Sequence, residues 1–454
     1  MKLKRIIPLS LVLIVVALVA WQYPRFYIAT GYGAKCLASG VFVAHRNANQ
    51  VIAQDLDYSI VKYTHSKIDY QKKTVTTSFL GVAHQTAVYR EGLGCTLVGD
   101  MPEKEVRSES HKQLAPQPAD PFEVAWPTGD QLKDTIFPEI NYTKLKKAMD
   151  GAFDHADEDL KRTAAVVVVY KNQLVGEEYW VQRGITPETR LWGWSMDKSI
   201  INAMLGVLKR EGKLNVNEPA PIPEWQNDQR KSITINNLMH MSSGLKWNED
   251  YGNVSDVTVM LYRKADVYKA AANAPYGVKP GTQWYYSSGT TNVLSGMIRH
   301  IIGNDSDYLD FPRKEIFNKI GMRSMLMETD AAGNFVGSSY GYATARDWAR
   351  FGLLFLDNGI WQGDTIVSPD WVKYTRTPAP ASKGNYGAQF WLNRDKSIPD
   401  APEDMFYCDG HRGQRVFIIP SKKLVVVRLG FSQEHFNQDG FLKEVLAAFP
   451  ADKQ

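Results

Sequence analysis

The stretch Ser195-Met196-Asp197-Lys198 decides the fold, because it places a serine and a lysine three residues apart at the start of a predicted helix. Residues three apart on a helix share one face, so the Lys198 amine can take the proton of the Ser195 hydroxyl and create a nucleophile. An apolar stripe from Ile201 to Leu208 follows, and Gly212 ends the segment. Taken alone, the pattern also fits a helix-capping serine followed by a solvated lysine, so its meaning depends on the residues downstream.

Two later segments carry chemistry that complements this pair. Residues 284–289 read Trp-Tyr-Tyr-Ser-Ser-Gly after a Lys-Pro-Gly turn. A tyrosine here, with its pKa lowered by a nearby ammonium, can move a proton between nucleophile and leaving group; aromatic packing at a core edge is the alternative. Residues 410–414, Gly-His-Arg-Gly-Gln, open an apolar strand that returns as a hairpin. Such a strand edge can supply one amide of an oxyanion hole, and the helix start at Ser195 can supply the other.

In order and spacing, the three segments resemble the serine-reactive penicillin-recognising family, which includes serine β-lactamases, D-Ala-D-Ala carboxypeptidases, esterases and 6-aminohexanoate-dimer hydrolases. The family pattern is Ser-x-x-Lys, then Tyr-x-Asn or Tyr-x-Ser, then Lys/His-x-Gly. This chain has Ser195-Met-Asp-Lys198, Tyr286-Ser-Ser288 and His411-Arg-Gly413. Residues 232–244 and 341–352 look similar as well, and the resemblance covers roughly residues 135–450.

The resemblance implies an α+β, β-lactamase/transpeptidase-like fold, in which helices flank an antiparallel sheet and a helical subdomain covers the site. Two departures from the pattern favour the esterase and 6-aminohexanoate-dimer branches. Ser288 replaces the usual asparagine, and His411 replaces the usual lysine. The loop Trp247-Asn-Glu-Asp-Tyr251 is also similar to the aminohexanoate-type loop, which brings a second tyrosine over the substrate.

The function that the resemblance implies is serine hydrolysis of an amide or ester through an acyl-enzyme, with no cofactor. Ser195 would attack the carbonyl, Lys198 and Tyr286 would share proton transfer, and the amides of Ser195 and Gln414 would form the oxyanion hole. The implied substrate contacts are His411, Gly413, Ser288, Tyr251 and Asp197. For Asp197, stabilisation of the helix start is the alternative to binding a substrate amine.

Three other functions remain open at this point. One is a penicillin-interactive carboxypeptidase or β-lactamase, and another is a non-catalytic envelope binding protein on the same fold. The third is an α/β-hydrolase, because residues 337–341 match the Gly-x-Ser-x-Gly pattern; however, the residues before it are typical of a turn and not of a strand.

Composition limits the partners. The chain has 454 residues, 44% hydrophobic content and a net charge of +4, which indicate a large core and give no case for nucleic acid binding. The histidines are scattered without metal-ligand spacing, and no glycine-rich phosphate loop is present. We therefore expect neither a metal nor a nucleotide, and a small amide, ester or short peptide as substrate.

The start of the chain predicts that the protein is located outside the cytoplasm. Basic residues at positions 2–5 precede an apolar run from Ile6 to Trp21, which is typical of a signal anchor. Residues 1–22 would keep the protein on the membrane with the catalytic domain in the periplasm. The alternative is a cleaved signal peptide and secretion.

Three units follow this segment. Residues 23–100 predict a small α+β module with strands near 39–43 and 74–82, in which Cys36 and Cys95 could form a disulfide or remain buried thiols. Residues 101–131 form a proline-rich linker. Residues 132–454 form the hydrolase domain, with a helix near 142–155, a buried strand at 163–170 and a closing helix at 441–449.

Overall fold

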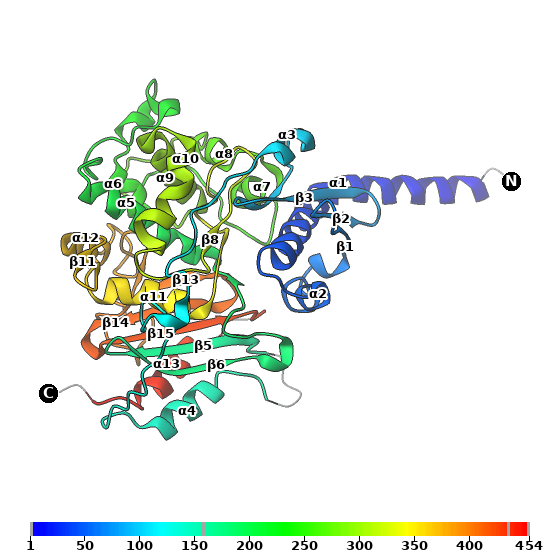
Figure 1. Cartoon of the computed structure of the whole chain (residues 1–454). Coiled ribbons are helices and arrows are strands. Elements are labelled where there is room, and N and C mark those ends of the chain that lie inside the picture. Colours follow the sequence, from blue (N-terminus) through cyan, green and yellow to red (C-terminus); the bar gives the residue numbers. More distant parts are fainter. Residues whose placement is uncertain (1–2, 156–159, 434–435, 452–454) are drawn as a thin grey trace.

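A six-stranded antiparallel sheet organises the main domain of the computed structural model, which describes residues 3–155, 160–433 and 436–451 (Figure 1). Strands from both ends of this domain meet at its centre, as the sequence predicts. Every residue of β5 is buried, because helices cover both faces of the sheet. In spatial order the strands are β12 (Trp391–Leu392), β13 (Phe406–Gly410), β14 (Gln414–Ile419), β15 (Leu424–Gly430), β5 (Thr163–Tyr170) and β6 (Gln173–Tyr179).

The valines of β5 point alternately into two hydrophobic cores, one on each face of the sheet. Val166 and Val168 pack against α4 (Tyr142–Asp150) and α13 (Gln438–Leu446). Val167 and Val169 belong to the larger core on the other face, which includes α11 (Ala345–Leu356). Side chains of a strand alternate between faces, so a continuous run of valines fits a sheet that is covered on both sides.

The helical subdomain lies above this sheet (Figure 1). Its central helix is α5 (Asp197–Arg210), which is buried from its first residue to Leu208 and packs beside α9 (Ser288–Ile302). The remaining elements are α6 (Ile235–Met239), α7 (Asp256–Arg263), α8 (Val267–Ala272), α10 (Asp305–Pro312), α12 (Pro369–Thr375), the sheet β7 (Leu191–Trp192), β9 (Gly341–Ala343) and β8 (Leu326–Met327), and the hairpin β10 (Ile360–Trp361) and β11 (Asp364–Thr365).

The N-terminal module combines helices with a four-stranded antiparallel sheet. Its elements are α1 (Leu3–Phe42), α2 (Ala48–Asp55), β1 (His65–Asp69), β2 (Thr74–Phe79), β3 (Ala83–Arg90) and β4 (Gly94–Leu97). The strand predicted near 39–43 is wrong, because α1 continues to Phe42. Helical spacing there aligns Lys35 and Ser39 on one buried face, where both side chains bond the Glu328 carboxylate of the main domain.

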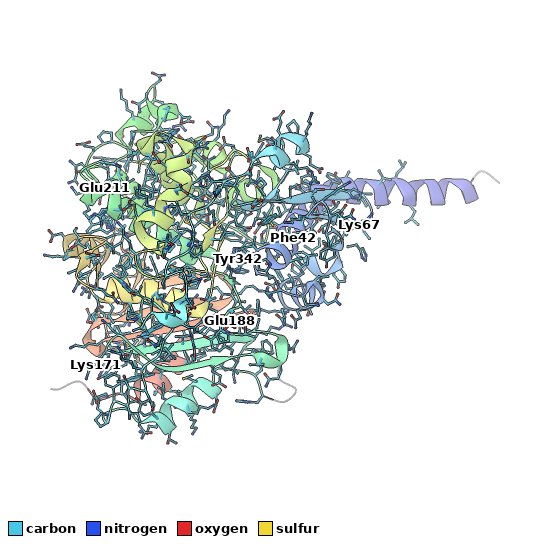
Figure 2. The ribbon with its side chains drawn as sticks, in the orientation of Figure 1. Phe42, Lys67, Lys171, Glu188, Glu211 and Tyr342 are labelled. Atoms are coloured by element: carbon cyan, nitrogen blue, oxygen red, sulfur yellow. The ribbon has the colours of Figure 1, made fainter. Side chains whose placement is uncertain are left out.

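The module and the main domain share one hydrophobic core. Buried residues of α1, such as Leu37, belong to the same cluster as those of α5. Figure 2 shows side chains filling the space between the module, where Phe42 is labelled, and the main domain, where Tyr342 is buried. The Lys35 ammonium lies 4.0 Å from the ring centre of Tyr340 in this contact.

Of the two alternatives for Cys36 and Cys95, the structure has the buried free thiols and not the disulfide. Burial is the main cause that raises the pKa of each thiol above its usual range. The backbone of Cys95 instead donates to the Glu328 carboxylate at 2.6 Å, so buried polar contacts attach this strand to the main domain.

The first half of α1 extends away from the body (Figure 1). Among the described residues, none of the helices meets the combined length and hydropathy of a transmembrane span. The extended part nevertheless exposes large apolar side chains, namely those of Leu11, Leu13, Ile14, Val16 and Trp21.

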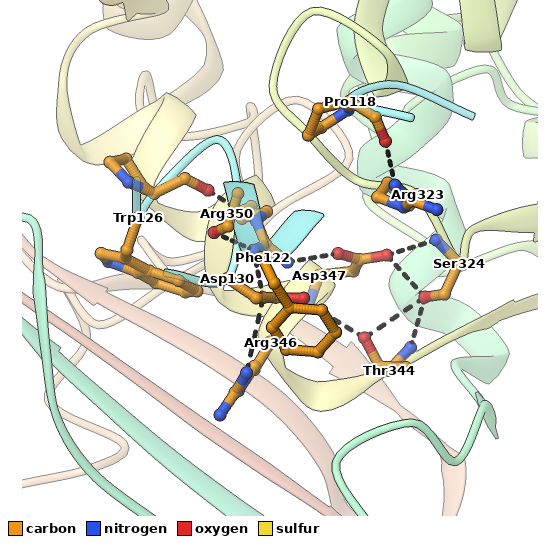
Figure 3. Close-up of polar contacts among 12 residues, drawn as sticks. Pro118, Phe122, Trp126, Asp130, Arg323, Ser324, Thr344, Arg346, Asp347 and Arg350 are labelled. Atoms are coloured by element: carbon orange, nitrogen blue, oxygen red, sulfur yellow. Dashed lines mark hydrogen bonds and ion pairs between the residues drawn. The ribbon is translucent and has the colours of Figure 1, made fainter. Parts of the chain in front are cut away.

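The proline-rich segment 101–131 is held on the main domain by buried arginines, as Figure 3 shows. Arg350 donates to the carbonyls of Pro127 and Gly129 at 2.6 and 2.7 Å and pairs with Asp130 and Asp347. Its guanidinium also lies 4.7 Å from the ring centre of Trp126. The segment includes α3 (Glu103–Ser108) and otherwise follows the surface through such contacts.

We expect Arg350→Met to lower the free energy of unfolding by about 3–5 kcal/mol, because it removes the guanidinium that pairs with the buried Asp347 carboxylate and donates to the Pro127 and Gly129 carbonyls. Urea denaturation followed by tryptophan fluorescence measures this loss. The matched control is Arg107→Met, which removes a partly exposed pair with Glu103 and should cost no more than about 1 kcal/mol. Equal losses in the two variants would contradict the role of Arg350.

Candidate active site

Ser195 and Lys198 meet as the sequence predicts. The Lys198 ammonium donates to the Ser195 hydroxyl at 2.9 Å, to the Ser288 hydroxyl at 3.1 Å and to the Ser338 carbonyl at 3.1 Å. Lys198 is 1% exposed, whereas Ser195 is half-buried and open to a ligand. Burial lowers the pKa of Lys198 to about 8, and the carboxylates of Glu249, Asp197 and Asp409 oppose this shift. The lysine can therefore exist as a neutral base near physiological pH.

Aromatic packing positions Ser195. Trp194, directly before Ser195, has a positive φ of 52°, which turns the chain into the helix start. Its ring stacks on Trp192 with centroids 3.6 Å apart and on Tyr32 of the N-terminal module at 5.8 Å. These stacked rings hold the backbone turn that presents the Ser195 hydroxyl.

Tyr286 also reaches the pair, but in a different electrostatic state from the one predicted. The Lys198 ammonium lies 4.8 Å from the centre of the Tyr286 ring. Burial raises the pKa of Tyr286 well above its usual range, and a hydrogen bond with Ser195 opposes this rise. The prediction of a lowered pKa is wrong, because loss of solvent outweighs the nearby ammonium. Tyr286 is a neutral phenol that can donate a proton.

Glu249 is the site residue that sequence reasoning missed. Its carboxylate accepts hydrogen bonds from the Ser288 hydroxyl, from the Ser288 backbone amide at 2.9 Å and from the Trp247 indole. Tyr251 adds its hydroxyl, which lies 3.1 Å from the Ser288 hydroxyl. A chain of hydrogen bonds thus runs from Glu249 through Ser288 to Lys198. From the sequence of the loop 247–251, only Tyr251 was predicted to belong to the site.

The third motif forms the wall beside the nucleophile. The His411 ring packs edge-on against Trp194 at 5.2 Å and parallel to Tyr251 at 6.3 Å. Desolvation and the nearby Arg412 and Arg415 lower the pKa of His411, so the ring is neutral at neutral pH. His411 therefore lines the site together with Trp194 and Tyr251.

Close backbone packing brings this motif to the helix start. A Cβ on Gly410 would lie 2.3 Å from the Gly193 carbonyl, so only glycine allows the strand to approach the turn before Ser195. Gly413 has a φ of 85°, and Arg428 donates to its carbonyl at 3.0 Å. Gln414 begins β14, with its side chain bonded to the backbone of Gly430. The oxyanion role of the Ser195 and Gln414 amides remains a prediction.

Two of the predicted substrate contacts are fully enclosed by the protein. Asp197 and Ser288 are both 0% exposed. Asp197 lies against Gly341, where a Cβ would come within 2.1 Å of the carboxyl oxygen, and burial raises its pKa well above the usual range. It is the first residue of α5, the position that the alternative role at the helix start requires. Ser288 instead holds Lys198 in place.

The alternative nucleophile elbow is also wrong. Ser339, its central serine, is 1% exposed and hydrogen bonded to Ser338 at 2.9 Å. Residues 331–333, shortly before the motif, form a turn and bend, and the last glycine of the motif, Gly341, begins the short strand β9. The motif contributes a backbone carbonyl to Lys198 and offers no accessible hydroxyl.

The sheet, the covering helices and the Ser-x-x-Lys pair at the start of α5 are the features of the β-lactamase/transpeptidase-like fold. The family model described as Beta-lactamase matches residues 150–448. The chain belongs to the beta-lactamase family.

Several known proteins are similar to the chain. The 6-aminohexanoate-dimer hydrolase of Paenarthrobacter ureafaciens is 23% identical over 323 residues, which cover 64% of this chain and 79% of that protein. A solved putative 6-aminohexanoate-dimer hydrolase from Bacillus anthracis has a TM-score of 0.54 and 24% identity, with 67% and 79% of the two chains covered. A family VIII carboxylesterase has a TM-score of 0.53 and 17% identity, with 70% and 98% covered. The two solved structures establish a common fold.

Proposed function

We propose that this protein is a serine hydrolase that cleaves an amide or ester through an acyl-enzyme on Ser195. The observation that carries the proposal is the 2.9 Å contact between the Ser195 hydroxyl and a buried lysine whose pKa is lowered to about 8. A primary alcohol is a weak nucleophile by itself, and an adjacent neutral amine is a sufficient base. The similarity to an aminohexanoate-dimer hydrolase supports a small linear substrate.

Each residue has a defined task in this mechanism. Neutral Lys198 takes the Ser195 proton while the Ser195 oxygen bonds to the substrate carbonyl carbon. Tyr286, as a neutral phenol, donates a proton to the leaving amine or alcohol, and Lys198 returns a proton to the phenolate. Water then attacks the ester intermediate while Lys198 takes its proton, and Lys198 passes that proton to the Ser195 oxygen as the bond to the acyl carbon breaks and the acid leaves. The amides of Ser195 and Gln414 stabilise the oxyanion in both steps.

A substrate panel tests the class of reaction. We expect the purified protein to hydrolyse p-nitrophenyl esters or linear aminohexanoate amides faster than a chromogenic cephalosporin, because His411 and Ser288 replace the lysine and asparagine of penicillin-interactive relatives. Preferential cephalosporin turnover would favour the β-lactamase alternative. Absence of turnover and of covalent labelling on every substrate would favour a binding protein.

The rate should follow the protonation of Lys198. Its base form predominates above a pKa of about 8, so kcat/KM should rise with pH through that region and then level off. Glu249 raises the pKa of Lys198, so Glu249→Gln should move the rise to lower pH. Stopped-flow or plate-reader profiles from pH 5.5 to 10 measure both effects.

The matched control is Glu188→Gln, a change in a separate cavity that should leave the profile unchanged. A profile of Glu249→Gln that stays in place or moves to higher pH would contradict the coupling between Glu249 and Lys198. A flat wild-type profile would contradict Lys198 as base.

We also propose that residues 1–22 anchor the protein in a membrane, with the catalytic domain on the extracytoplasmic side. The exposed apolar side chains along the extended part of α1 support this, together with the basic residues that precede them. Fractionation of cells that express the full chain tests the anchor. Recovery in the membrane pellet after carbonate washing is expected, whereas release of a shortened chain into the medium would indicate a cleaved signal.

A further inference from the structure

A cavity of about 440 Å³ lies where the N-terminal module meets the catalytic domain. Nine of its sixteen lining residues precede residue 150, at which the family match begins. Ile28, Ala29 and Tyr32 of α1 form one side, and Ile60 and Val61 form another. The module therefore supplies a binding wall that the family domain does not contain.

The inner end of this cavity reaches the candidate active site. Trp194, Tyr251 and His411 line it, and Trp194 directly precedes the nucleophile. The hydroxyl of Tyr251 lies 3.1 Å from that of Ser288, which accepts from Lys198. A ligand in the cavity would thus contact residues that also contact the hydroxyl–amine network.

The module is attached firmly at this place, so the cavity is pre-formed. Arg412, between His411 and Gly413, donates to the Asp55 carbonyl of α2 at 2.8 Å. Its guanidinium also lies 4.8 Å from the centre of the Tyr58 ring. Because Tyr32 stacks on Trp194, the module touches both the third motif and the turn before the nucleophile.

The lining is apolar and aromatic in its interior and polar at one end. Isoleucine, valine, alanine, tyrosine and tryptophan side chains make up most of the surface. Apart from the tyrosines, Arg25 and His411 are the ionisable residues of the lining, and Arg25 donates to Asn253 at 2.8 Å. Such a lining favours a hydrocarbon chain over a charged or strongly polar group. The volume falls within the range of small-molecule sites, roughly 300–1,000 Å³.

We propose that this cavity is an acyl-chain subsite, and that the substrates are esters or amides of linear, medium-length hydrocarbon acyl chains, which match its apolar lining. The proposal rests on Ser195 acylation as described above. The chain would lie between α1 and Tyr262, with its carbonyl at Ser195. The base of the extended apolar half of α1 forms the outer end, near Gln22.

Chain-length selectivity tests the subsite in the full-length protein. The measurement is kcat/KM for p-nitrophenyl acetate, butyrate, octanoate and decanoate below their critical micelle concentrations. Each buried methylene multiplies affinity roughly threefold to fourfold, so the octanoate-to-acetate ratio should exceed about tenfold even with partial burial. Ile28→Trp and Ile60→Trp each fill the cavity and should lower this ratio at least fivefold.

Ile52→Trp is the matched control, because Ile52 lies on the same module, is 44% exposed and is outside the cavity. It should keep the wild-type ratio. A wild-type ratio near one, or unchanged ratios in both cavity variants, would overturn the subsite while acetate hydrolysis leaves Ser195 chemistry intact. If no ester is hydrolysed and Ser195 takes no covalent label, the proposed function fails as well.

Discussion

Ser195→Ala should reduce kcat/KM by a factor on the order of 10⁴ or more, as loss of a catalytic serine does in other serine hydrolases. The variant loses the oxygen that forms the acyl-enzyme, and no other described hydroxyl lies beside Lys198 with comparable access. Ser288 is the other hydroxyl within 3.1 Å of the lysine, and it is fully buried. Initial rates on the preferred ester and circular dichroism of the variant measure activity and fold together.

Ser339→Ala is the control for this loss. Ser339 is the serine that the Gly-x-Ser-x-Gly pattern would select, and its buried hydroxyl is hydrogen bonded to that of Ser338. We expect activity within threefold of wild type. If Ser339→Ala lost hydrolytic activity and Ser195→Ala retained it, Ser339 and not Ser195 would be the nucleophile.

Lys198→Met should lower kcat/KM by about 10²–10⁴, the range for loss of a positioned general base. Methionine keeps much of the length and apolar volume of the lysine stem but cannot accept a proton. The same variant should lose the rise in rate near pH 8, since no titrating amine remains. A pH profile that kept this rise would show that another group is the base.

The Lys198→Met change also leaves the Ser338 carbonyl and two hydroxyls without their donor, so fold and activity must be separated. Thermal unfolding of the variant gives the stability change. Lys443→Met, which removes an exposed pair with Asp400 on α13, controls for general loss of a lysine and should retain full activity. Full activity in Lys198→Met would contradict the mechanism.

Periodic patterns of apolar residues correctly predicted the strands and the helix that surround Ser195. The buried β5 strand, the β14–β15 hairpin and the α5 helix follow from apolar runs and their turn residues, because burial and backbone hydrogen bonding act over short stretches. The closing helix, predicted at 441–449, lies three residues earlier, at Gln438–Leu446. The Ser195–Lys198 contact followed from helical spacing. The family resemblance supplied the convergence of Tyr286 and the third motif, which no local pattern could provide.

The errors arose where tertiary packing decides the outcome. Residues 39–43 have strand-like composition, but Lys35 and Ser39 must share a helical face to reach Glu328, and this buried contact overrides local preference. Asp197 and Ser288 were assigned by type, whereas their roles depend on complete burial. Glu249 escaped notice because an acidic residue in a polar loop is usually solvated, and only the fold shows the 2.9 Å contact of its carboxylate with the Ser288 amide.

The central claim is that Ser195 is the residue that becomes acylated. The most direct measurement is peptide mass spectrometry after brief incubation of the full-length protein with a fluorophosphonate probe, repeated on Ser195→Ala. We predict one phosphonylated peptide, modified at Ser195, and no adduct in the variant. A label on another serine, or wild-type hydrolysis with Ser195 unmodified by an active probe, would contradict the account.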